Sequence, residues 1–135
     1  MNLELSKKQF RRLLDLVYIG NWILNSTRGD QRFADYDEVE SLIFGRAALE
    51  GMPGLAELYQ GEIVPSRAFV EGGIHEAIAE YENSVFFDIL AEDLARRDMD
   101  DVPIDESNLE ELNRRIDAYI DEFEAHGTDN ITVDC

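Results

Sequence analysis

The chain has 135 residues, of which 44% are hydrophobic and 10% aromatic, and its formal net charge is −18. The length corresponds to one domain, and the apolar content argues against disorder, because disordered chains lack the apolar surface that offsets ordering entropy. Residues 68–135 carry twenty carboxylates against four arginines, whereas residues 1–67 carry ten acids and eight bases. This charge argues against direct nucleic-acid binding, which needs a basic surface.

Compartment is indicated by the cysteine count and the N-terminal residues. The one cysteine, Cys135, has no intrachain partner, which fits a reducing environment. Residues 1–24 resemble a signal peptide loosely, but Asp15 and Asn21 interrupt the apolar stretch, and it is too short to span a bilayer. We therefore expect a cytoplasmic protein that is not associated with a membrane.

The first predicted helix covers residues 7–26. Ser6 and Gln9 have the spacing of a capping box, in which each side chain bonds the other residue's backbone N–H. Between Leu13 and Leu24 nearly every residue is apolar, and a helix that is apolar on all sides normally lies in the centre of a bundle or at a subunit interface.

The second predicted helix covers residues 36–50. Asp35 and Glu38 resemble a second capping box, and Gly51 followed by Pro53 indicates the end of the element. Residues 53–60 are expected to form a short additional helix before a connection at 61–66.

The third predicted helix, residues 73–97, changes its apolar face after Asn83 and Ser84. Such a helix is sandwiched between neighbours, bends, or docks its second half onto another subunit, and the sequence leaves these three alternatives open. The second-half apolar residues are the candidate oligomer interface: Phe86, Phe87, Leu90 and Leu94.

The fourth predicted helix covers residues 107–126, with a capping-box pattern at Ser107 and Glu110 and a clean apolar stripe on one side. Residues 2–5 and 131–134 alternate like short strands at the termini. Together the elements predict an all-α fold, a compact bundle of about four main helices forming a single helical domain over residues 1–135.

No recognised catalytic or metal-binding constellation occurs. Di-metal bundles use Glu-x-x-His, whereas Glu71 precedes His75 and Glu122 precedes His126 by four residues. The acidic segment from Asp98 also lacks the glycine and glutamate of an EF-hand loop. We therefore expect no catalytic residue, no cofactor and no metal, and a protein that is not an enzyme.

The acidic second half suggests the function. Four carboxylates lie along one side of the last helix, with rises of about 10, 6 and 4.5 Å between them; they are Glu110, Asp117, Asp121 and Glu124. Our leading hypothesis is an interaction or regulatory protein, similar in role to an immunity protein, antitoxin or inhibitor, that presents this acidic face to a basic protein partner.

Several alternatives stay open beside that hypothesis. A nucleic-acid mimic would show the same carboxylate spacing, which is of the order of phosphate spacing. A small-ligand or metal-binding enzyme built in a helical bundle needs no sequence signature. A solubilising surface would account for the charge without any partner. Homo-oligomerisation is a separate expectation from the apolar faces of the first and third helices.

Overall fold

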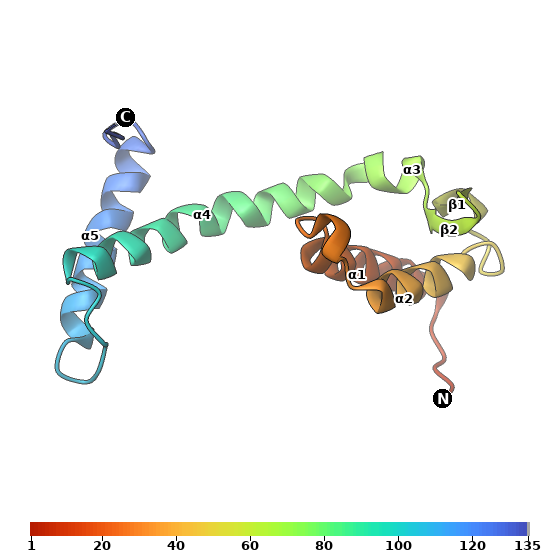
Figure 1. The fold of residues 1–135 in the computed structure, drawn as a ribbon. Helices are drawn as coiled ribbons and strands as arrows, with labels where there is room; N and C mark the ends of the chain where they lie inside the picture. The colour runs from red at the N-terminus through yellow and green to blue at the C-terminus, as the bar shows by residue number, and fades with distance from the viewer. Residues whose placement is uncertain (135) are drawn as a thin grey trace. The chain divides into compact units, whose positions relative to one another are not determined.

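The computed structural model describes residues 1–134 and is mostly helical, as predicted. In chain order its main elements (Figure 1) are α1 (Lys7–Asn25), α2 (Ala34–Gly45), β1 (Ala56–Tyr59), β2 (Glu62–Pro65), α3 (Arg67–Phe69), α4 (His75–Asp98) and α5 (Leu109–His126). Short 3-10 turns lie at Gly29–Gln31 and Pro53–Leu55, and a π-helical turn lies at Val70–Ile74.

The chain divides into two compact units, Met1–Ile78 and Ala79–Cys135, and the boundary falls within α4. The two units differ in which residues contact one another, and the division does not show whether they fold separately. The expectation of a single domain over residues 1–135 therefore stays a prediction.

The start of α1 is the predicted capping box. The Gln9 backbone N–H donates to Ser6 Oγ at 3.1 Å, and the Ser6 N–H donates to Gln9 Oε1 at 2.9 Å. Within the chain α1 is not buried on all sides, because Leu16 and Ile23 are 69% and 56% exposed, so α1 does not lie in the centre of a bundle, and a subunit interface stays a prediction. One face of α1 therefore packs on the core and the other faces solvent.

The core of the first unit forms where α1, α2 and the segment leading into α4 meet. Its buried members are Phe10, Leu14, Tyr18, Phe44, Ala47, Phe69 and Ile78. Phe69 makes edge-to-face contacts with Tyr18 and Phe44, with ring centroids 5.4 and 5.0 Å apart. Aromatic pairs of this geometry add to the burial energy.

The second helix is shorter than predicted. It runs from Ala34 to Gly45 rather than over 36–50, because the Arg46 and Ala47 backbone N–H groups bond carbonyls three residues back and tighten the chain into turns. Gly51 then adopts a positive φ of 79°, a conformation that glycine allows. The Asp35 capping box is also wrong, since the helix begins at Ala34 and no side chain caps it.

The additional helix predicted at 53–60 is only a 3-10 turn at Pro53–Leu55, and a β-hairpin begins at Ala56. In it β1 pairs with β2 antiparallel, from Ala56 opposite Pro65 to Tyr59 opposite Glu62. Gln60 and Gly61 form the two-residue turn with φ of 51° and 81°, the left-handed conformations that hairpin turns of this length require. The hairpin lies against α2, where the Ser41 hydroxyl donates to the Ile63 carbonyl at 2.6 Å.

The predicted terminal strands are wrong. Residues 2–5 and 131–134 form no strand in the described chain. Two segments of four residues bury too little side-chain surface to hold a ladder without neighbouring strands.

The third predicted helix begins later than residue 73. Gly73 has φ of 113°, which interrupts the helical conformation, and the regular helix α4 starts at His75. The unit boundary, between Ile78 and Ala79, lies about one helical turn before the predicted change of apolar face at Asn83 and Ser84. Ile78 is buried in the first unit, whereas Ala91 and Ala95 are buried in the second.

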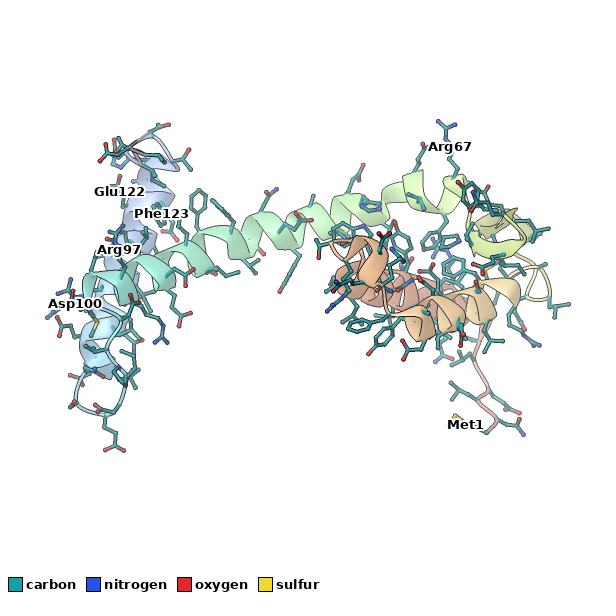
Figure 2. All side chains as sticks on the ribbon, viewed as in Figure 1. Met1, Arg67, Arg97, Asp100, Glu122 and Phe123 are labelled. Carbon is teal, nitrogen blue, oxygen red and sulfur yellow. The ribbon has the colours of Figure 1, made fainter. Side chains whose placement is uncertain are left out.

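The second unit packs α5 against the second part of α4. The apolar stripe of α5 is confirmed, since Leu112 and Phe123 are buried and Phe123 contacts Phe87 with ring centroids 5.1 Å apart. Figure 2 labels Phe123 on α5 and Arg97 at the end of α4. The helix begins at Leu109 rather than 107, because the Ser107 hydroxyl donates to Asp105 and caps no helix N–H.

Candidate functional site

The four predicted acidic residues of α5, which we call the acidic face, are all exposed: Glu110, Asp117, Asp121 and Glu124. Within residues 1–134, no hydrogen bond or ion pair of any of their carboxylates is found. Since α5 is one continuous helix, the four groups share one side of a rigid element.

The other carboxylates of α5 are partnered. Glu111 accepts from Arg115 at 2.9 Å and lies 3.9 Å from Arg114. Glu122 accepts from Asn130 at 2.6 Å and contacts His126 at 3.0 Å, and these contacts lower its pKa, the Asn130 bond contributing most. Arg114 therefore pairs with Glu111 and not with Glu110.

The remaining arginines of the second unit also pair within the chain. Arg96 bonds Glu92 at 2.9 Å, and Arg97 bonds Asp98 at 2.9 Å. The Tyr119 hydroxyl donates to the same Asp98 carboxylate, which lowers the pKa of Asp98 and raises that of Tyr119. This cluster joins α5 to the end of α4 and leaves no described arginine of the unit free to neutralise the acidic face.

The four residues of the candidate oligomer interface differ in their exposure. Phe87 packs on Phe123 inside the second unit, and Leu90 and Leu94 are half-buried there. Phe86 is 51% exposed and touches only the edge of Phe87 among the aromatic rings, with centroids 5.0 Å apart. Three of the four residues thus contribute to packing within the chain.

A polar cluster in the first unit was not predicted. Asn25, 1% exposed, holds the connection to α2, because its Nδ2 donates to the Phe33 carbonyl at 3.1 Å and its Oδ1 accepts from the Phe33 N–H at 2.7 Å. Its Nδ2 also donates to Asn21 Oδ1 at 2.6 Å, and Asn21 donates to Asp37 at 3.0 Å. The sequence signal was two asparagines four residues apart in an apolar helix.

The carboxylates beside this cluster differ in their environment. Arg32 bonds Asp37 at 2.8 Å, and this pair, helped by Asn21, lowers the pKa of Asp37. Burial raises the pKa of Glu40, and the neighbouring Asn21 and Arg32 offset that rise only in part. The negative charge of Asp37 is therefore balanced by Arg32. For the charge of Glu40, the cost of burial exceeds the favourable contacts.

A small cavity of about 120 Å³ lies at the same place, between α1, α2 and their connection. It is lined by Tyr18, Asn21, Trp22, Ser26, Arg32 and Glu40. Two of these lining residues contact His75: the Tyr18 hydroxyl is 2.6 Å from His75 Nε2, and the Trp22 and His75 ring centroids lie 5.5 Å apart. Burial, followed by the Glu40 charge, raises the pKa of Tyr18, so its hydroxyl is held in the protonated form.

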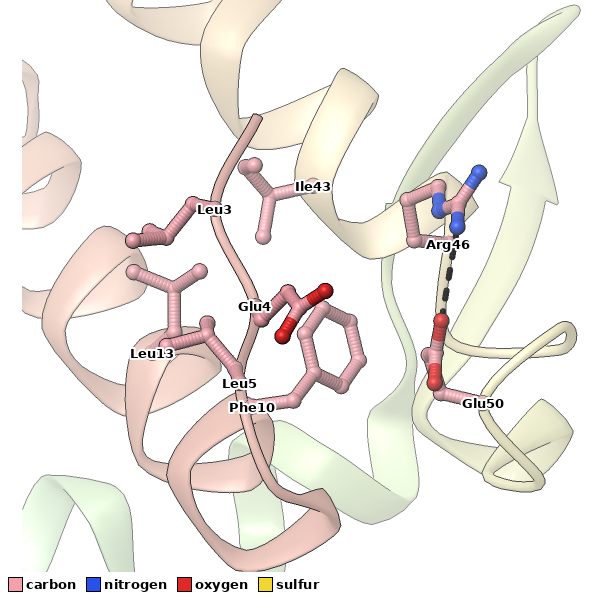
Figure 3. Close-up of a pocket in the computed structure, with 8 residues that line it drawn as sticks. All are labelled: Leu3, Glu4, Leu5, Phe10, Leu13, Ile43, Arg46 and Glu50. Atoms are coloured by element: carbon pink, nitrogen blue, oxygen red, sulfur yellow. Dashed lines mark hydrogen bonds and ion pairs between the residues drawn. The ribbon is translucent and has the colours of Figure 1, made fainter. Parts of the chain in front are cut away.

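A larger, open groove of about 530 Å³ lies between the N-terminal segment, α1 and α2. Figure 3 shows Leu3 and Leu5 beside Phe10 and Leu13, with Arg46 and Glu50 on the far side. The dashed line marks the Arg46–Glu50 pair at 3.4 Å, in which the two charges neutralise each other. Glu4 also lines the groove, so its lining combines apolar side chains with three charged ones.

In residues 1–134 no group of three or more His, Asp or Glu side chains is arranged to hold a metal ion. None of the described helices combines the length and apolarity that crossing a bilayer requires.

Comparisons of the chain with protein-family models, with curated proteins and with solved structures find no match.

Proposed function

We propose that the protein is a non-enzymatic interaction or regulatory protein that binds a basic protein partner through the acidic face. The observation that carries the proposal is the contrast on α5 between four exposed, unpaired carboxylates and two that are paired within the chain. A charged helix side with no internal partner is complementary to a row of lysines and arginines. Such complementarity accelerates association and selects partners.

The test separates the acidic face from net charge. The first variant combines Glu110→Gln, Asp117→Asn, Asp121→Asn and Glu124→Gln. Its matched control neutralises four other exposed acids of the second unit, Glu80→Gln, Glu82→Gln, Asp88→Asn and Asp93→Asn. Both variants lose the same charge, so only the position of the lost charges differs.

The partner is first captured from a lysate of the native host at 50 mM salt and identified, and its affinity for each variant is then measured. We expect the acidic-face variant to lose at least tenfold in affinity and the control to lose less than threefold. Equal losses in both variants would show that net charge alone acts. Binding unchanged at 500 mM salt would contradict the electrostatic basis.

A nucleic-acid mimic is the narrower form of the same proposal. It requires the captured partner to be a nucleic-acid-binding protein and this chain to displace DNA or RNA from it. A ternary complex with undiminished nucleic-acid affinity would leave only the broader form.

Self-association is a second proposal, favoured by the exposure of Phe86. A second copy covering this ring and the adjacent Ile89, 58% exposed, would extend the helical packing into a bundle. Light scattering at micromolar concentration tests this. We expect a mass above the monomer that Phe86→Ser reduces, and a monomeric mass of the unmodified chain would refute it.

A further inference from the structure

The cavity between α1 and α2 has features of a binding site that the acidic face does not use. It is bounded on one side by Tyr18 and Trp22 of α1 and on another by Glu40 of α2. Because Tyr18 is buried and bonded to His75, that ring is fixed before any ligand arrives. Rigid, pre-oriented groups reduce the entropy that binding costs.

The charges around the cavity leave one carboxylate unmatched. Arg32 and Asp37 form an ion pair at 2.8 Å and cancel each other. Glu40 is half-buried and forms no ion pair within residues 1–134. The net charge of Arg32, Asp37 and Glu40 is therefore −1, and the unpaired charge is partly shielded from water. A cation binds such a charge more strongly than it binds a charge at the surface.

The aromatic lining restricts the class of cation. Trp22 and Tyr18 contribute aromatic rings to the lining, and such rings attract organic cations, while Glu40 contributes carboxylate oxygens that accept from N–H groups. A guanidinium group satisfies both, since it stacks by its face and donates by its edge. The chain uses the same stacking elsewhere, with the Arg28 guanidinium 3.9 Å from the Phe33 ring centroid and Arg11 5.0 Å from that of Phe69.

The size of the cavity agrees with this class. Its volume is about 120 Å³, which leaves room for a small group but is well below the several hundred Å³ typical of pockets for larger ligands. Asn21 and Ser26 supply further polar contacts at the rim.

We propose that this cavity binds a guanidinium group, with Glu40 as its counter-ion and the rings of Trp22 and Tyr18 as its stacking surface. The group is either part of a small free guanidine compound or the end of an arginine side chain from a protein partner. This site lies in the first unit and is independent of the acidic face on α5.

Trp22 is the one tryptophan of the chain and lines the cavity, so its fluorescence reports occupancy directly. Methylguanidinium chloride is titrated to 50 mM at an ionic strength held constant with NaCl. We expect a saturable change with a dissociation constant in the millimolar range. Glu40→Gln should weaken binding at least tenfold, whereas Glu38→Gln, an exposed acid on the same helix, should change it less than twofold.

A second arm distinguishes the two sources of the group. N-acetyl-arginine amide is compared with N-acetyl-citrulline amide, its uncharged analogue of similar shape. Binding of the arginine compound at least tenfold tighter than methylguanidinium indicates a side chain as ligand, and equal binding indicates a small free compound. Citrulline binding as tight as arginine, a non-saturating response, or unchanged affinity of a Glu40→Gln protein with native circular dichroism would overturn the proposal.

Discussion

Replacing Asn25 with alanine tests whether one buried side chain holds the connection between α1 and α2. Asn25 makes three hydrogen bonds, one to Asn21 at 2.6 Å and two to the Phe33 backbone at 2.7 and 3.1 Å. Each bond contributes about 1 kcal/mol net, and the partners left buried gain nothing in return. We therefore expect Asn25→Ala to lower the free energy of unfolding of the first unit by about 3 kcal/mol.

Urea unfolding followed by Trp22 fluorescence measures this loss, because the tryptophan belongs to the same unit. With an m-value of about 2 kcal/mol per M, the midpoint should fall by about 1.5 M. Gln31→Ala, at an exposed position of the same connection, is the control and should stay within about 0.5 kcal/mol. A loss below about 1 kcal/mol for Asn25→Ala would show that water replaces these bonds, and would refute the reasoning.

Three further expectations concern burial and charge. Leu14→Ala, at 0% exposure, should cost about 3 kcal/mol in the same assay, whereas Leu16→Ala, at 69% exposure, should cost almost nothing; equal losses would place the core elsewhere. Phe123→Ala removes the contact with Phe87 and should lower the helical signal of the second unit in far-ultraviolet circular dichroism, without shifting Trp22 fluorescence; an unchanged spectrum would contradict this packing. Glu40→Gln should raise the urea midpoint at pH 7. The pKa of Glu40 in the folded state lies above the reference value of 4.5, so ionisation of this group opposes folding. The difference in midpoint between the variant and the unmodified protein should therefore shrink as the pH falls toward 4.5. A midpoint lowered at pH 7 would show that the ionised group is stabilising.

Sequence patterns predicted the elements that depend on local contacts. The Ser6–Gln9 capping box and the apolar stripe of α5, including Leu112 and Phe123, involve residues three or four apart along one helix. Such signals are complete within a short window of sequence. They were therefore sufficient to place α1 and α5 to within one or two residues.

The wrong predictions concern elements whose structure depends on long-range contacts or on the backbone conformation of one residue. The hairpin turn uses Gln60 before Gly61, which is a weaker signal than Asn-Gly, so the strands on either side were not expected. Gly73 interrupts α4 through its positive φ, which the sequence does not specify.

One candidate site could be predicted from local sequence and the other could not. The exposure of the acidic face followed from helical spacing alone. The cavity near Glu40 did not, because it depends on α2 lying beside Tyr18 and Trp22, twenty or so positions away in the sequence.

The pairing of every arginine in the second unit has a consequence for its stability. With those cations already engaged, the exposed carboxylates of α4 and α5 repel one another across a small helical hairpin, which behaves as a compact polyanion. Added salt screens this repulsion over about 10 Å at 0.1 M and should stabilise the hairpin. Salt would weaken the proposed binding of a basic partner at the same concentrations. A bound basic partner would displace the salt cations and reduce the same repulsion, so it would stabilise the folded second unit to which it binds.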